Sequence, residues 1–189
     1  MDVPGREHAL IITNAAINIA PTLAEKIDIL QNAIDLGHAL RMQEVRVAIF
    51  SAMETVNAKL PSTIEAVALC KMVDRRQITG ALVDGPLTLD NAIDPDAART
   101  KKIDSPVAGR ANVLMVPDLE ADNMLAKSLS FLAGADAPVI LTSRADSVLT
   151  RLARRAWWRR WWPPNAAPTR NWADCGEFSE AGAGARPAK

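Results

Sequence analysis

Short apolar runs alternate with longer segments of helical periodicity along the first 142 residues, and this alternation restricts the fold to a few classes. Residues 10–13, 46–51, 78–83, 111–116 and 138–142 are predicted strands, rich in Val, Ile and Leu. Apolar residues three and four positions apart predict helices over residues 23–40, 64–75 and 123–133. The alternation favours an α/β fold, in which a mostly parallel sheet is flanked by helices.

The last two predicted strands enclose the strongest candidate site. The first is Ala111–Val116, and the second, Pro138–Thr142, is followed at once by Ser143, Arg144 and Asp146. Ligands of open α/β sheets collect at the carboxyl ends of the strands, so these polar side chains are candidates for binding. A simpler interpretation is that Ser143 or Asp146 caps a following helix, and the two interpretations are compatible.

A second polar group follows the predicted strand 78–83. Asp84 and Gly85 come directly after it, and we expect them to lie beside the loop that carries Ser143. Asp90 and Asn91 then predict a helix start or a turn, which is as good an explanation of these two residues as a functional role.

Charge is distributed unevenly although the whole chain is formally neutral. Residues 151–189 contain 8 Lys and Arg against 3 acidic residues, together with all five tryptophans, so residues 1–150 carry the compensating negative charge. Cys70 and Cys175 have no metal-ligand spacing and form no disulfide framework. The first residues lack the basic and apolar regions of a signal peptide, and no apolar run is long enough to span a membrane, so a cytoplasmic location is expected.

Several long motifs resemble one family. They are ITNAAINIAP (12–21), ALCKMVDRRQITG (68–80), VDGPLTLDNAI (83–93), SPVAGRANVLMVPDLEADN (105–123) and ILTSRADS (140–147). In this order they resemble the C-terminal half of phosphate acetyl/butyryl-transferases, including the phosphate acetyltransferase part of bifunctional proteins with an enoyl-CoA hydratase. The resemblance implies a fold like that of isocitrate and isopropylmalate dehydrogenases. It also implies transfer of an acyl group between coenzyme A and inorganic phosphate.

The same resemblance implies roles for individual residues. Ser143 and Arg144 match the substrate-binding pair of the family, and Asp84 and Asn123 are further predicted contacts to phosphate or coenzyme A. Phosphate acetyltransferases have an aspartate that acts as a base a few residues beyond this pair, near Thr150 here, and Asp146 is a weak substitute. No metal or prosthetic group is implied, because coenzyme A is a substrate or product.

Three departures from the family pattern predict a truncated and impaired enzyme. The N-terminal half is absent, and a segment of the type GIVLGA is missing before Pro138. Asp122 also stands where the family commonly has glycine, and its charge would oppose an anionic phosphate. An alternative is a non-catalytic remnant, which could form a homo-oligomer or pair with a full-length homologue.

The resemblance ends at residue 152, so we divide the chain into a transferase part, 1–152, and an unrelated tail, 153–189. The tail is rich in Trp, Arg and Pro and has few aliphatic residues, which predicts disorder. A shifted reading frame would explain its composition. The other explanation is a tail that binds an anionic membrane or nucleic acid, but its Trp and Arg residues are poorly segregated, so we expect neither partner.

Overall fold

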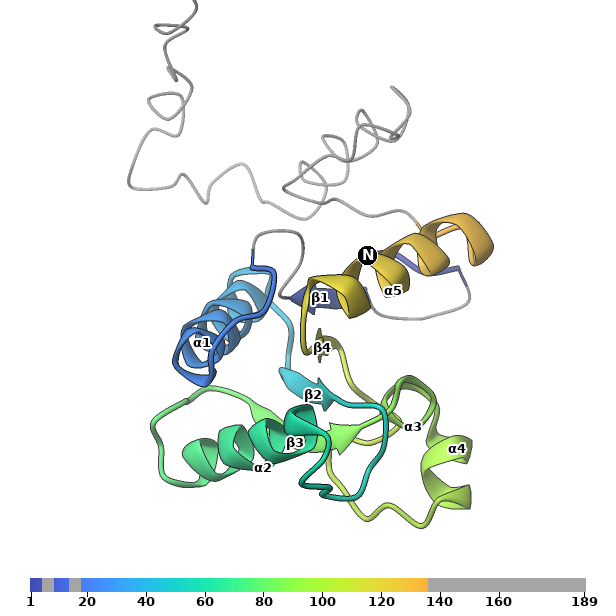
Figure 1. The fold of residues 1–189 in the computed structure, drawn as a ribbon. Coiled ribbons are helices and arrows are strands. Elements are labelled where there is room, and N and C mark those ends of the chain that lie inside the picture. The colour runs from blue at the N-terminus through green and yellow to red at the C-terminus, as the bar shows by residue number, and fades with distance from the viewer. Residues whose placement is uncertain (5–8, 14–17, 136–189) are drawn as a thin grey trace, which may run out of the picture.

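The computed structural model describes residues 1–4, 9–13 and 18–135 (Figure 1). Its elements are β1 (Ile11–Thr13), α1 (Leu23–Ala39), β2 (Arg46–Phe50), α2 (Pro61–Asp74), β3 (Leu82–Leu87), α3 (Leu89–Ile93), α4 (Pro95–Thr100), β4 (Val113–Met115) and α5 (Leu119–Leu132). The predicted strand 138–142 and the tail lie outside the described residues. None of the helices in the described part is long and apolar enough to cross a membrane.

The four strands within the described residues form one parallel sheet in the order β1-β4-β2-β3. In the register of the central pair, Val47 of β2 lies opposite Val113 of β4. Successive strands run in the same direction, so each connecting helix returns from the carboxyl edge of the sheet to its amino edge. The predicted class, an α/β fold with a parallel sheet and flanking helices, is confirmed.

Helices cover both faces of the sheet, and alternate residues of the central strands face opposite layers. Val47 and Ile49 of β2 pack in one apolar cluster with residues of α1 and α2. Ala48 and Phe50 pack in the other cluster, which includes residues of α3, α4 and α5. Figure 1 shows the same arrangement, with α1 and α2 on one side of the strands and α4 and α5 on the other. Both faces of β2 are therefore buried, as its continuous apolar sequence requires.

Each long helix begins at the carboxyl edge with a recognisable start. The Thr22 side chain accepts a hydrogen bond from the Glu25 backbone N–H, and the Glu25 carboxylate bonds back to Thr22 in a capping box. Pro61 occupies the first turn of α2, where its missing N–H costs nothing. The Asp118 side chain caps α5 by accepting from the Ala121 N–H at 2.8 Å.

Several predicted boundaries were wrong by three or more residues. β3 begins at Leu82, not at residue 78, because the chain turns at Gly80, which has a φ of +92°. α5 begins at Leu119, four residues before the predicted start, because Asp118 already caps it. α2 begins at Pro61, three residues early. The expected helix start at Asp90 is confirmed as α3, whereas α4 was not predicted.

Gly85 allows β3 to pack closely against β2 and α2. A Cβ atom at this position would lie 2.7 Å from the Ile49 carbonyl oxygen and 3.4 Å from Ala66 Cβ. The first distance is too short for any real contact, and a backbone atom can yield only if the two strands separate. The glycine of the DGPL motif therefore has a packing role.

We expect Gly85→Ala to lower the free energy of unfolding by about 2 kcal/mol, as overpacking typically does. Gly134→Ala is the matched control, because a Cβ there meets only Pro4 at 4.0 Å although φ is +63°. The control should lose only the backbone cost of about 1 kcal/mol. Urea unfolding of both variants measures the difference, and equal losses would contradict the packing role of Gly85.

Candidate functional site

A shallow cleft opens at the carboxyl ends of the two central strands. Its lining comes from α1, α2 and the ends of β2 and β4, and consists of Lys26, Ile49, Phe50, Ser62, Glu65, Leu69, Met115, Val116 and Pro117. Ligands of parallel α/β sheets bind at this edge. Most of the lining is apolar, and the polar groups of the cleft come from the first turns of α1 and α2.

The principal charged groups in the cleft are an ion pair between these two helices. Lys26 of α1 is 5% exposed, and its Nζ donates to Glu65 Oε2 of α2 at 2.5 Å. Glu65 remains partly solvated, with 30% of its side chain exposed. A buried ammonium is tolerated only when it is paired, so each residue depends on the other for its position. Beside the pair, the hydroxyls of Ser62 and Ser51 are hydrogen-bonded at 2.8 Å.

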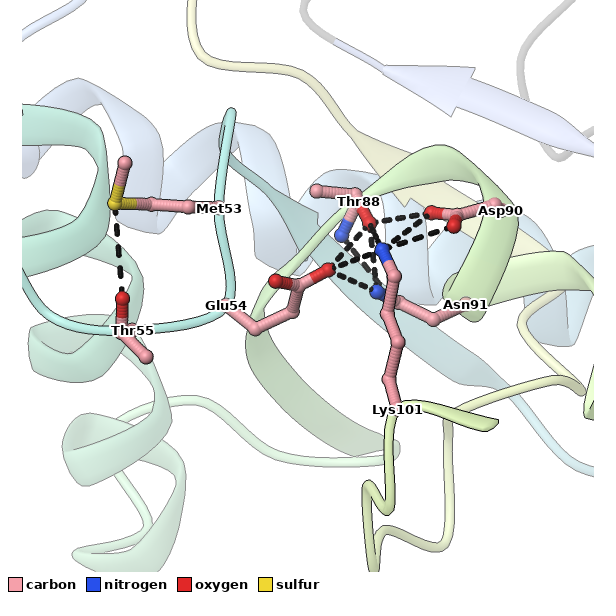
Figure 2. A network of polar contacts seen from close by, with 7 residues as sticks. All are labelled: Met53, Glu54, Thr55, Thr88, Asp90, Asn91 and Lys101. Carbon is pink, nitrogen blue, oxygen red and sulfur yellow. Dashed lines mark hydrogen bonds and ion pairs between the residues drawn. The ribbon is translucent and has the colours of Figure 1, made fainter. Parts of the chain in front are cut away.

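A second polar cluster lies at the ends of β2 and β3 (Figure 2). Glu54 comes from the loop after β2, Thr88 and Asp90 follow β3, and Lys101 follows α4. Lys101 Nζ donates to Glu54 Oε1 at 2.6 Å and to Asp90 Oδ2 at 2.9 Å. The buried Asn91 amide also donates to Glu54 Oε1 at 2.5 Å. The cluster thus joins the loop after β2 to the start of α3 and the end of α4.

Hydrogen bonds within this cluster shift the pKa values of its side chains in the direction that favours the charged forms. The bond from Lys101, followed by that from Thr88, lowers the pKa of Glu54. The Thr88 bond and then the Lys101 bond lower the pKa of Asp90 to about 2. The same bonds, first to Glu54 and then to Asp90, raise the pKa of Lys101. One ammonium for two carboxylates leaves the cluster negative, so it does not favour an anionic ligand.

Asp122 is a buried carboxyl group for which the described residues supply no compensating charge. It lies in the first turn of α5, is 3% exposed, and its Oδ1 has no hydrogen-bond partner within the described part of the chain. Burial raises the pKa of Asp122 to about 6. The sequence suggested that this carboxylate would oppose a bound phosphate, and the structure places it inside the protein.

Two of the predicted substrate contacts, Asp84 and Asn123, lie within the described residues. The structure does not bring them close to each other. Asp84 lies within β3, opposite Ala48, and accepts a hydrogen bond from the Gly85 N–H at 2.8 Å. The expectation that it follows the end of a strand was wrong, because β3 continues to Leu87. Asn123 is exposed on α5, which contacts β1, and β1 and β3 are opposite edges of the sheet.

The remaining predicted residues, Ser143, Arg144 and Asp146, lie outside the described residues, so their roles stay predictions. Sequence reasoning missed Lys26 and Glu65, which are separated by 39 positions. One signal was available, because Lys26 falls on the apolar stripe of α1 at helical spacing from Leu30. The described part of the chain contains no group of three or more His, Cys, Asp or Glu side chains that could hold a metal ion.

Comparison with known proteins identifies the family. Residues 1–152 match the family model described as phosphate acetyl/butaryl transferase. The chain belongs to this family. A phosphate acetyltransferase of Rhizobium meliloti is 64% identical over 162 residues, which are 81% of this chain and 51% of that protein. A probable phosphate butyryltransferase of Bacillus subtilis is 46% identical over 160 residues, covering 80% of this chain and 54% of the relative.

Solved structures of the phosphate acetyl/butyryl-transferase family have the same fold. A branched-chain phosphotransacylase from Enterococcus faecalis superposes with a TM-score of 0.76 at 32% identity, covering 85% of this chain and 60% of that one. The chain spans about half the length of the curated relatives it matches. The sequence-based identification of the family is therefore confirmed.

Asp122 should make stability depend on pH. Its pKa is about 6 when folded and 3.8 as a free carboxyl, so only well below pH 3.8 is it protonated in both states and without cost. Between pH 4 and 6 the unfolded chain releases the proton first, and stability falls by up to about 3 kcal/mol. Above pH 6 the loss is constant.

We expect Asp122→Asn to raise the free energy of unfolding by about 1–3 kcal/mol at pH 7.5, the amide still lacking a full set of partners. The difference from the wild type should become small near pH 4, where the folded carboxyl is protonated and the free one is about half ionised. Glu120→Gln, on the exposed side of the same turn, is the control and should change little at either pH. Urea titrations at the two pH values test this, and an equal gain at both would rule out the carboxylate as its source.

Proposed function

We propose that this chain takes part in acyl transfer between coenzyme A and inorganic phosphate, giving an acyl phosphate and free coenzyme A or the reverse. The observation that carries the proposal is the family match over residues 1–152, which includes Ser143 and Arg144. Two relatives at 64% and 46% identity are named as a phosphate acetyltransferase and a probable phosphate butyryltransferase. They support short acyl groups as substrates.

The chemistry sets clear demands on the site. A phosphate oxygen attacks the thioester carbonyl, a tetrahedral oxyanion forms, and the C–S bond breaks as the thiolate of coenzyme A leaves. Arg144 suits phosphate because a guanidinium is always charged and binds two oxygens at once. The Ser143 hydroxyl would donate beside it, and Asp146 would accept or return the thiol proton. The chemistry needs no metal or prosthetic group.

The described residues supply one side of such a site. Ser143 and Arg144 follow the predicted strand 138–142, and the carboxyl edge of a parallel sheet is where strands of this kind deliver their following loops. The cleft at the ends of β2 and β4 lies at that edge. Asp84 and Asn123 remain proposed substrate contacts, although the structure separates them.

We expect purified protein to release thiol from acetyl-CoA or butyryl-CoA only when phosphate is added. Arg144→Ala should lower the rate of release at least about a hundredfold, because it removes a contact that positions the substrate. A coloured thiol reagent measures the release. The matched control is Arg75→Ala, which removes an exposed arginine just after α2. Equal rates for wild type and Arg144→Ala would overturn the role of Arg144.

The same assay distinguishes a catalytic chain from the alternative, a non-catalytic partner of a full-length homologue. A chain that binds coenzyme A or phosphate without turnover, and gains activity only when mixed with a full-length homologue, would replace the catalytic proposal with a pairing function. Light scattering on the same sample determines whether the chain forms a homo-oligomer.

A further inference from the structure

The outward face of α2 is apolar, whereas that of its neighbour α1 is charged. Both helices lie on the same side of the sheet (Figure 1). The outward side chains of α1 include Glu25, Asp28 and Asp35, which are exposed, as expected for a solvated face. The outward side chains of α2 include Ile64 and Val67, which are 47% and 41% exposed. Over its first two turns α2 is thus apolar on both sides, which is typical of a helix that is buried on both sides.

One stripe of exposed side chains runs along this outward face. Its members recur every three or four positions and so project from the same side of the helix: Pro61, Ile64, Val67, Lys71 and Asp74. The first three are apolar, and the last two form an ion pair at 2.9 Å. Val56, in the loop before α2, is another exposed apolar side chain. The outward stripe is therefore apolar in its amino-terminal half and charged in its carboxyl-terminal half.

The distribution of charge along the outward stripe is complementary to itself. If two copies of α2 pack antiparallel about a two-fold axis, Ile64 of each copy meets the partner's Val67. Lys59 precedes Ile64 by five positions, and Asp74 follows Val67 by seven. At 1.5 Å per residue their distances from the axis differ by about 3 Å, which a lysine side chain can span. Lys59 is exposed and has no ion pair among the described residues, so its ammonium is available to Asp74 of the partner subunit.

We propose that the outward face of α2 is a homodimer interface, in which the outward stripes of two copies pack antiparallel. A second copy fits this face better than the tail 153–189 does, because Lys59 and Lys71 flank its apolar half and would repel the arginines of the tail. The inward side of the same helix carries Ser62 and Glu65, which line the cleft. The dimer would therefore hold the helix that forms one wall of the cleft.

Sedimentation of the full chain over a range of concentrations tests the interface. We expect a dimer, and we expect Val67→Arg to raise its Kd at least about tenfold, because the two introduced charges face each other across the two-fold axis. Met124→Arg is the matched control, since Met124 is 69% exposed on α5, which lies on the other side of the sheet. The control should leave the Kd unchanged.

An exchange of charges tests the antiparallel arrangement independently. Lys59→Glu and Asp74→Lys should each weaken the homodimer by about tenfold, since each turns two attractive pairs into repulsive ones. An equimolar mixture of the two variants should form a heterodimer with a Kd near that of the wild type, because every pair across the interface again joins opposite charges. The substituted positions are all exposed, so the variants should fold, and melting curves check this.

Three results would overturn the proposal. The first is a wild-type chain that stays monomeric at about 100 µM, a concentration at which an association of even −5.5 kcal/mol is half formed. The second is a dimer that Val67→Arg leaves intact or that Met124→Arg weakens equally, because the contact would then lie on another surface. The third is a mixture of the charge variants that associates no more tightly than either variant alone. None of these measurements depends on turnover, so the dimer and the acyl transfer are tested separately.

Discussion

The pairing of β2 with β4 in the middle of the sheet is the constraint on which the rest of the structure depends. These strands place Val47 and Val113 against one helical layer and Ala48 and Leu114 against the other, and all four side chains are fully buried. Parallel strands joined by helices that return along both faces leave the sheet buried between two helical layers. The carboxyl edge, with its loops and helix starts, follows from this arrangement.

The charged groups of the two polar clusters at that edge have partners, whereas the described residues give Asp122 none. Lys26 is paired with Glu65, and Glu54 is held by Lys101 and Asn91. Asp122 lacks a partner for Oδ1 within the described residues, and its pKa rises accordingly. An uncompensated buried carboxyl is destabilising at neutral pH, so Asp122 reduces the stability that the sheet and helices provide.

The glycine and acid of the DGPL motif show why a motif can be recognised before its role is understood. The sequence placed Asp84 and Gly85 just past a strand, as ligand-binding residues often are. In the structure both lie inside β3, and Gly85 is needed because its Cβ position is occupied by the Ile49 carbonyl. The motif identified the family correctly, whereas the role of its glycine depends on a contact 36 positions away.

The sequence by itself determined the class of fold, the family and most of the helices and strands, because apolar spacing and capping residues act over a few neighbouring positions. It did not determine where β3 begins, since that depends on the turn at Gly80 and on pairing with β2. Only the tertiary structure brought Lys26 to Glu65, and Glu54 to Lys101, across 39 and 47 positions. Apart from the place of Lys26 on an apolar stripe, such pairs leave no local pattern, because the fold, and not the separation in the sequence, sets the distance between the two charges.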